Sequence, residues 1–343
     1  MAQVNDIGID LGTSNVLIYM RGKGIVLREP AVVALDRDTN TVLAVGSDAY
    51  RMIGRTPGNV VTIRPLRQGT VGDFGLLNTM VRQFILHTCG KHFFNRPRAV
   101  ISVPSGVNDM EKRSIINLMF DAGARHTQLL DRSMAAALGV GIDFSEAYGT
   151  MIVDMGAGMT DIAVLAMGEV VIATSNGIGG DYFNDAIIRY LRKKHNLLIG
   201  ERTADEIKMS IGSAVPQPNE VTMDVTGRNL ISGMPRTQAI TSVEVYEALR
   251  EPVSELIEAI QGVLERTPPQ LAADIFEEGI VLTGGAAALT GLAEAVYDAL
   301  HIPCGVADDP QTSVAVGCGR ALEPSQTNRD MLNASRVAGR RRR

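Results

Sequence analysis

The chain contains 343 residues, of which 45% are hydrophobic and 21% are charged, an ordinary globular balance with enough length for two domains. A net charge of −5 at pH 7 argues against a dedicated nucleic-acid binder, so no nucleic acid is expected among the partners. No run of 18 apolar residues is present, so no transmembrane helix is expected. Three cysteines without CxxC spacing indicate free thiols in a reducing compartment, namely Cys89, Cys304 and Cys318.

The first half of the chain opens with alternating apolar and polar residues over 7–35, a pattern that predicts three strands. A turn-rich stretch over 36–75 is typical of a small inserted subdomain. The elements predicted after it are a helix over 76–89, a strand over 99–103, a helix over 108–122, a strand over 128–130 and a helix over 133–141. The last helix contains three consecutive alanines, which suit close packing against a neighbouring element.

The second half restarts the pattern, with three strands predicted over 150–173 and a glycine turn at 177–181. The later predicted elements are helices over 182–195 and 204–211, a β insertion over 214–242, a long amphipathic helix over 245–264, a strand over 279–283, and helices over 289–300 and 314–321. Residues 324–343 are polar, end in four arginines, and are predicted to form a flexible basic tail.

One motif occurs in both halves, as Ile9-Asp10-Leu11-Gly12 and Val153-Asp154-Met155-Gly156. Each copy places an Asp at the end of a short apolar strand and then turns through glycine into another strand. Glycine permits tight turns whose N–H groups converge on an anion, and Asp is a hard oxygen ligand for magnesium, here through water. A single copy would suggest an ordinary hairpin. Two copies in matching contexts predict a site for a nucleotide polyphosphate and magnesium.

Each half is therefore predicted to run β-β-β-α-β-α with an insertion. We expect an α/β fold of two duplicated domains, with small inserted subdomains, around a nucleotide cleft. The predicted limits are 5–147 plus 310–323 for the first domain, with its subdomain at about 36–75, 148–309 for the second, with its subdomain at about 183–242, and 324–343 for the tail.

At this point the sequence resembles the actin, sugar-kinase and DnaK-type superfamily, and within it the MreB/Mbl family of bacterial actins. The stretches that carry the resemblance, besides the two turns, are Leu282-Thr283-Gly284-Gly285, Ile63-Arg64-Pro65-Leu66, Gly200-Glu201-Arg202-Thr203-Ala204, Gly233-Met234-Pro235-Arg236 and Thr267-Pro268-Pro269-Gln270-Leu271. They extend over roughly residues 5–322. The resemblance implies an ATP-binding, actin-like filament protein that organises cell-wall synthesis and cell shape.

The resemblance also assigns roles to individual residues. It implies phosphate turns at Gly12, Thr13, Ser14 and Asn15 and at Gly156, Ala157, Gly158 and Met159, an adenosine-contacting segment at Ala204, Asp205, Glu206, Ile207 and Lys208, and an adenine-side turn at Gly284, Gly285, Ala286 and Ala287. ATP or ADP would bind there, with Asp10 and Asp154 holding Mg²⁺ through water. Asp205 and Lys208 lie three apart on one helix face, so both can reach the ribose and base, although a solvated ion pair is the alternative. Gly179-Gly180-Asp181 is either a further nucleotide-proximal turn or a helix start with an Asp cap.

The chain departs from the family pattern at Asp131-Arg132-Ser133, where Glu-Glu-Pro is usual and the second Glu positions the attacking water. Arginine stays cationic and only donates hydrogen bonds, so it cannot take that role. Asp131 is the one catalytic candidate left nearby. Ala157 and Met159 also replace the usual Gly and Thr. We therefore expect nucleotide binding with slow hydrolysis, at most a slow ATPase, unless Asp131 substitutes for the missing group.

Phe93 and Phe94 are adjacent aromatic residues among basic neighbours, a combination that suits insertion at an anionic bilayer surface. Family members are expected to touch the membrane at the matching loop. The alternative is that the rings pack beneath the loop as core. The resemblance further implies three partners, namely other copies of the chain in a filament, the inner face of the cytoplasmic membrane, and membrane proteins of cell-wall synthesis.

Two other functions belong to the same superfamily. A small-molecule kinase would need an Asp in the cleft as base for a substrate hydroxyl, and no Asp here has that family context. A chaperone ATPase would need a peptide-binding domain, and only about 20 residues follow Glu323. The sequence therefore favours the filament protein.

Overall fold

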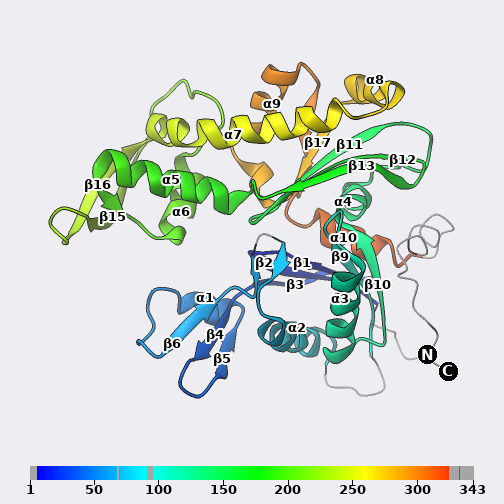
Figure 1. Cartoon of the computed structure of the whole chain (residues 1–343), viewed down its shortest axis with the longest axis horizontal. Coiled ribbons are helices and arrows are strands. Elements are labelled where there is room, and N and C mark those ends of the chain that lie inside the picture. Colours follow the sequence, from blue (N-terminus) through cyan, green and yellow to red (C-terminus); the bar gives the residue numbers. More distant parts are fainter. Residues whose placement is uncertain (1–5, 68, 91–95, 324–331, 333–343) are drawn as a thin grey trace. The chain divides into compact units, whose positions relative to one another are not determined.

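The computed structural model describes residues 6–67, 69–90, 96–323 and 332, and Figure 1 shows how the elements follow one another. Contacts divide the chain into two compact units. The first contains Met1–Tyr148, Leu165–Ser175 and Gln311–Arg343, and the second contains Gly149–Val164 and Asn176–Pro310. Among the described helices, none combines the length and the apolar run that crossing a bilayer requires.

Two five-stranded sheets have the same strand order, β3-β2-β1-β9-β10 and β13-β12-β11-β17-β18. In the first sheet β1 is antiparallel to β2 and parallel to β9, and in the second β11 is parallel to β17. The strands are β1 (Ile7–Leu11), β2 (Asn15–Met20), β3 (Gly24–Pro30), β9 (Arg98–Val103), β10 (His126–Asp131), β11 (Thr150–Met155), β12 (Thr160–Ala166), β13 (Glu169–Asn176), β17 (Ile280–Thr283) and β18 (Cys304–Val306). The predicted α/β class with a duplicated strand pattern is thereby confirmed.

Successive side chains of strand β1 face two different helical layers of the first unit. Ile7 and Ile9 join the apolar core beneath α2 (Phe74–Cys89) and α3 (Asp109–Asp121). Gly8 faces the other way, onto α10 (Ser313–Arg320), where an added Cβ would lie 2.4 Å from the Gly319 nitrogen. Because side chains alternate along a strand, Asp10 shares the face of Gly8. Figure 1 shows α10 beside α4 (Arg132–Val140) on this side of the sheet.

Helices α4 and α10 pack unusually closely, through glycine and alanine. A Cβ added to Gly139 of α4 would lie 1.7 Å from the Ser313 oxygen, and one added to Gly317 of α10 would lie 1.7 Å from the Ala135 oxygen. Such backbone approach is possible only without side chains between the helices. The predicted packing role of the alanine run is confirmed, because Ala135, Ala136 and Ala137 are fully buried.

Residues 33–71 of the first unit form small elements of their own, namely the sheet β5-β4-β6, the hairpin β7-β8 and helix α1. Their bounds are β4 (Val33–Asp36), β5 (Thr41–Val45), α1 (Ser47–Arg51), β6 (Val60–Ile63), β7 (Leu66–Arg67) and β8 (Thr70–Val71). Helix α3 begins where capping chemistry predicts, because Asn108 accepts from the Glu111 N–H and the Glu111 carboxylate accepts from the Asn108 N–H.

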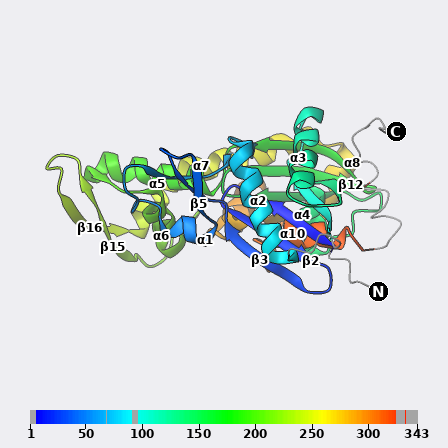
Figure 2. The same ribbon diagram turned by 90° about the horizontal axis from the view of Figure 1, so that it is seen from below.

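The second unit surrounds its strands with helices and adds a small sheet, β14-β15-β16. Its further elements are α5 (Gly180–His195), β14 (Leu197–Leu198), α6 (Glu201–Ile211), β15 (Thr222–Asn229), β16 (Pro235–Thr241), α7 (Ser242–Leu264), α8 (Pro269–Glu278), the 3₁₀ turn η1 (Gly285–Ala288) and α9 (Leu292–Leu300). Figures 1 and 2 both show the β15–β16 hairpin extending past α5 and α6. Helix α8 was not predicted from the sequence, although Pro269 is well suited to the first helical position.

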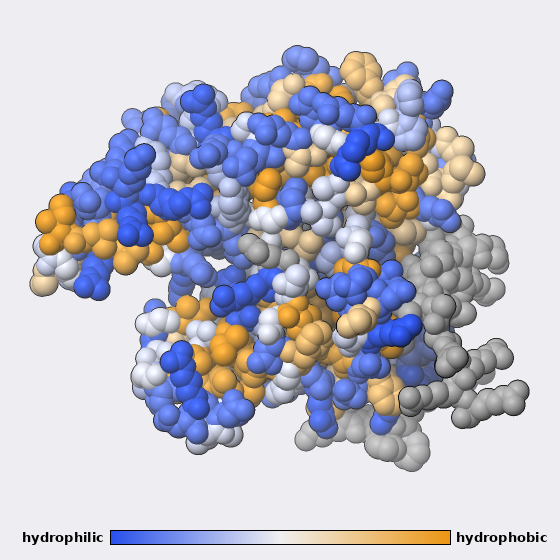
Figure 3. Space-filling view, in the orientation of Figure 1, coloured by the Kyte–Doolittle hydropathy of each residue, from blue (hydrophilic) through white to orange (hydrophobic). Residues whose placement is uncertain are grey.

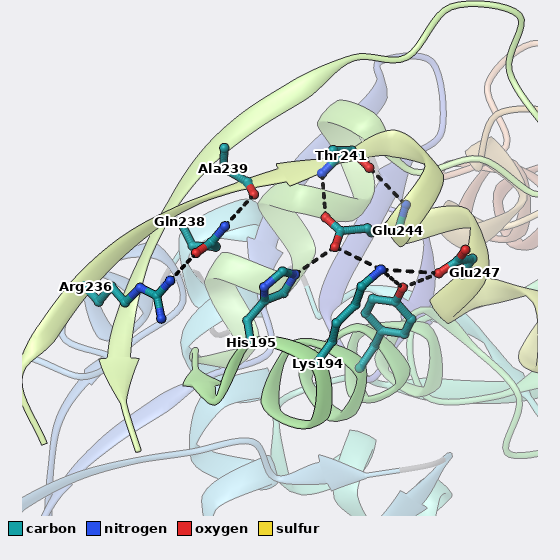
Figure 4. Close-up of polar contacts among 9 residues, drawn as sticks. Lys194, His195, Arg236, Gln238, Ala239, Thr241, Glu244 and Glu247 are labelled. Atoms are coloured by element: carbon teal, nitrogen blue, oxygen red, sulfur yellow. Dashed lines mark hydrogen bonds and ion pairs between the residues drawn. The ribbon is translucent and has the colours of Figure 1, made fainter. Parts of the chain in front are cut away.

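A polar cluster joins the end of α5 to the start of α7 (Figure 4). The Glu244 carboxylate accepts from the Thr241 N–H at 3.0 Å, bonds to the His195 ring at 2.8 Å and pairs with Lys194 at 3.2 Å. Burial by itself raises the pKa of Glu244, but these hydrogen bonds and charges outweigh it and lower the pKa overall. The cluster therefore fixes the direction of α5, whose other end lies at the second glycine turn.

Candidate functional site

The two predicted phosphate turns are closed by the same backbone hydrogen bond. The Gly12 N–H donates to the Asn15 oxygen at 3.0 Å, and the Gly156 N–H donates to the Met159 oxygen at 2.9 Å. A Cβ added to Gly12 would lie 2.7 Å from the Asn15 oxygen, so glycine is required there by close approach. The unusual Met159 therefore leaves the backbone of the second turn in the same form as that of the first.

Helix α5 starts directly against the second turn. The Gly180 and Asp181 N–H groups donate to the Gly156 and Ala157 oxygens at 3.0 and 2.8 Å. A Cβ on Gly179 would lie 2.6 Å from the Ala157 oxygen. The N-cap is Gly179, without a side-chain hydrogen bond, so the alternative of an Asp cap is wrong. The glycines instead let the helix start and the turn share backbone bonds.

Lys208 of α6 is buried at the same place. Its ammonium donates to the Gly180 oxygen at 3.1 Å and to the Asn184 amide oxygen at 2.8 Å, and it pairs with Asp205 at 2.8 Å. The Lys208 side chain is 9% exposed, whereas that of Asp205 is 51% exposed. The ion pair of the alternative is therefore confirmed, but it is solvated only at Asp205, and Lys208 is buried where it ties α6 to the start of α5. Glu206 pairs with Arg202 on the exposed face, and Ala204 and Ile207 are core.

Four predicted segments meet around Gly180. A Cβ added there would lie 3.3 Å from the Lys208 ammonium, 3.5 Å from the Ala157 Cα and 3.8 Å from the Ala286 Cβ. The turn that carries Ala286 depends on Gly284, which has a φ of 85° and lies so close to Met155 that a Cβ would be 2.3 Å from its oxygen. The second unit thus brings together the second turn, α5, α6 and η1 around small side chains and one buried cation.

Asp10 makes a contact that the sequence analysis did not predict. Its Oδ1 accepts from the Arg132 guanidinium at 2.7 Å and from the Ser102 hydroxyl at 3.0 Å. The side chains of Arg132 and Asp10 are only 9% and 8% exposed. Breaking such a buried pair by removing one partner typically costs about 3–5 kcal/mol. The signal available in the sequence was Arg132 itself, because an arginine in an otherwise apolar helix start needs an acidic partner.

Of the two predicted magnesium ligands, Asp10 is less suited to the metal than Asp154. Asp10 already has a cation on its carboxylate, so it is a poor place for a second one. Asp154 is 2% exposed at the end of β11, in register with Thr283 of β17. Among the described residues, no group of three or more His, Cys, Asp and Glu side chains is placed to hold a metal ion directly. The assignment of Mg²⁺ to Asp10 and Asp154 stays a prediction.

Asp131 is held as the N-cap of α4. Its Oδ1 accepts from the Ser133 N–H at 2.9 Å, and its Oδ2 accepts from the Ser105 hydroxyl at 2.8 Å. Burial raises the pKa of Asp131 despite these hydrogen bonds. The residue also borders a cavity of about 340 Å³ that is lined by Lys112, Met134 and Glu169 among others. Capping accounts for the contact of its Oδ1, and the catalytic role of Asp131 stays a prediction.

Phe93, Phe94 and the basic tail at 324–343 lie outside the described residues, apart from Leu332. The membrane prediction for the two phenylalanines therefore stays a prediction. All three cysteines are free thiols, with Cys318 buried and the others half-buried. Burial raises the pKa of Cys89 to about 11.

Comparisons with known proteins agree with this geometry. The chain matches the family described as MreB/Mbl protein over residues 4–330. It is 45% identical to the cell shape-determining protein Mbl of Bacillus subtilis (strain 168) over 318 residues, which covers 93% of this chain and 96% of the relative. It is 46% identical to the cell shape-determining protein MreB of Escherichia coli (strain K12) over 324 residues, which covers 93% of each.

Solved structures give the same result. MreB5 of Spiroplasma citri bound to ADP superposes with a TM-score of 0.88 at 33% identity, over 92% of this chain and 95% of that one. The same protein bound to AMPPNP superposes with a TM-score of 0.88 at 32% identity. The fold of this chain thus belongs to a known architecture. The chain is a member of the MreB/Mbl family and has its actin-like fold.

Proposed function

We propose that this chain is an ATP- and ADP-binding, actin-like filament protein that helps to determine cell shape. The observation that carries the proposal is the meeting of the second turn, α5, α6 and η1 around Gly180, where a Cβ would touch residues from three of these segments. The glycine and alanine residues of this junction keep its side chains small, as backbone that approaches a nucleotide closely requires. The structural neighbours bound to ADP and to AMPPNP support the choice of ligand.

Different residues would contribute different interactions to nucleotide binding. The glycine turns at Gly12 and Gly156 offer backbone N–H groups to phosphate oxygens. Lys208 supplies a buried positive charge, and Gly284, which has no Cβ, lets the turn before η1 lie against the backbone of Met155. Mg²⁺, which neutralises phosphate charge when bound, would be held through water by Asp154, because the other predicted ligand, Asp10, is already paired with Arg132.

We further infer that hydrolysis is slow. Arg132 cannot accept a proton from an attacking water, and both Asp131 oxygens already accept hydrogen bonds, Oδ1 from the Ser133 N–H at the start of α4 and Oδ2 from the Ser105 hydroxyl. Loss of a general base or water-positioning group typically slows a reaction by about 10² or more. Single-turnover phosphate release tests this inference. A family-like rate that Asp131→Asn abolishes, while the helix cap is retained, would overturn it.

Self-association would place many copies of the chain on the inner face of the cytoplasmic membrane, where they would organise membrane proteins of cell-wall synthesis. The exposed tip of the β15–β16 hairpin is compatible with contacts between copies. Figure 3 shows apolar surface at this tip, where Ile231 is 81% and Met234 is 65% exposed. Exposed apolar groups of this kind often mark interaction sites. The relatives are named for cell shape, and none of these observations favours a small-molecule kinase.

Sedimentation tests the filament proposal. With ATP, the pelleted fraction should rise above a critical protein concentration and electron microscopy of the pellet should show filaments. A protein that binds ATP but stays in the supernatant at every concentration would contradict the filament proposal and leave nucleotide binding intact. Ile231→Ser is expected to lower the pelleted fraction, with the exposed Val171→Ser on β13 as a control for the loss of one surface aliphatic group.

A further inference from the structure

The carboxylate that precedes the first glycine turn is neutralised from within the chain. Asp10 lies two residues before Gly12, and its Oδ1 is 2.7 Å from a guanidinium nitrogen of Arg132. The Ser102 hydroxyl binds the same oxygen at 3.0 Å. Arg132 stands at the first residue of α4, so its position is fixed by the helix and by the Asp131 cap beside it.

The pair is held in place by packing on the rest of the first unit. Helix α10 lies against both α4 and β1, with Gly317 touching α4 and Gly319 lying next to Gly8. Both side chains of the pair are nearly buried, so each charge depends on the other for compensation. The guanidinium also keeps its charge at every accessible pH. The positive charge that Arg132 places beside Asp10 is therefore permanent.

A bare carboxylate next to a phosphate repels it unless a cation lies between them. A divalent metal meets that need in a site of this chemistry. In this chain the Asp10 carboxylate at the first turn already has a cation beside it, because it is paired with the guanidinium of Arg132. Asp10 is thus poorly suited to metal binding, and it is also less repulsive to a polyphosphate than a bare Asp would be.

We propose that Arg132 replaces the divalent cation at Asp10, so that this chain binds nucleoside di- and triphosphates with little dependence on Mg²⁺. The inference rests on the proposed nucleotide binding and concerns the first glycine turn. It assigns Arg132 as a positioning and charge-neutralising residue rather than as a catalytic one. A Mg²⁺ held through water by Asp154 is then not required for nucleotide binding.

The experiment measures the Kd of ADP and of ATP by isothermal titration, with excess Mg²⁺ and with EDTA. For the unmodified chain, the two Kd values for ADP should agree within about threefold. Arg132→Gln should bind ADP with a Kd roughly tenfold or more higher in EDTA, the loss expected for one charge-assisted interaction, and Mg²⁺ should restore most of the affinity. Arg132→Lys, which keeps the charge, should remain largely independent of the metal.

Arg113→Gln is the matched control, because Arg113 is an exposed residue of α3 in the same unit and its loss changes the net charge equally. The Kd of Arg113→Gln for ADP should equal that of the unmodified chain, both with excess Mg²⁺ and with EDTA. An unmodified chain that binds ADP tightly with Mg²⁺ and loses roughly thirtyfold or more in EDTA would overturn the inference. That result needs no variant, so a poorly folded Arg132→Gln does not weaken the test. A chain that binds no nucleotide under either condition would instead refute the proposed function.

Discussion

Replacing Gly317 by alanine tests whether the close contact of α4 and α10 holds the first unit together. The added Cβ would lie 1.7 Å from the Ala135 oxygen and 2.9 Å from the Gly139 nitrogen. Both neighbours are backbone atoms of α4, so neither can rotate away as a side chain would. The helices must therefore separate.

The size of the effect follows from the distances. Ordinary contact begins near 3.4 Å, so the separation needed is about 1.7 Å, the difference between 3.4 and 1.7 Å. Overpacking of this kind costs about 1–3 kcal/mol, and occasionally more. Helix α4 begins with Arg132, whose 2.7 Å bond to Asp10 cannot survive such a shift unchanged. We therefore expect Gly317→Ala to lower the free energy of unfolding by about 3 kcal/mol, at the upper end of that range.

Urea unfolding followed by circular dichroism measures this loss, with hydrogen exchange of the α4 and α10 peptides to locate it. Gly262→Ala is the control, because Gly262 lies inside α7 with open space at its Cβ position. That variant should be stabilised by up to about 1 kcal/mol, the difference in helix propensity between glycine and alanine. A Gly317→Ala protein within about 0.5 kcal/mol of the unmodified chain would refute the packing argument.

Lys208→Met should raise the Kd for ADP by roughly tenfold because it removes a buried ammonium, and an unchanged Kd in isothermal titration would argue against its role. Asp131→Ala should lose about 1–2 kcal/mol in urea melts while Asp131→Asn, which still caps a helix, should lose little, and equal losses would contradict capping. The lowered pKa of Glu244 means that its stabilisation is fully present above the ordinary Glu pKa of about 4.3 and is lost as the pH falls through the lower pKa of the folded state. Glu244→Gln should therefore be less stable than the unmodified chain at pH 7 and approach its stability as the pH falls below about 4.3, and a difference that does not change with pH would be inconsistent with this linkage. Phe93→Ala/Phe94→Ala should reduce co-sedimentation with anionic liposomes, and unchanged binding would leave the membrane proposal without support.

Local chemistry made much of the fold predictable. The start of α3 follows from Asn108 and Glu111, which lie three residues apart and satisfy each other's backbone groups. The two glycine turns were predictable because an Asp at a strand end followed by Gly is a short motif, and its repetition marked the duplication. The prediction of a small-residue packing helix at 133–141 likewise depended only on adjacent residues.

Contacts between distant parts of the sequence were harder to predict. The Asp10–Arg132 bond joins residues that come together only after β9 and β10 are placed beside β1, and no local pattern gives that register. For the same reason the spacing of Asp205 and Lys208 indicated a surface pair, whereas the fold brings Gly180 and Asn184 over the lysine and buries it. Secondary structure thus followed from neighbouring residues, while the charges of the site depended on tertiary structure.

Nucleotide binding is the central claim, and isothermal titration of the intact chain with ADP and ATP tests it most directly. We predict saturable binding of one nucleotide per chain that is lost when Gly284, whose Cβ position is blocked by Met155, is replaced by valine. Absence of saturable heat for both nucleotides, at concentrations up to about 1 mM where even weak sites fill, would contradict the account.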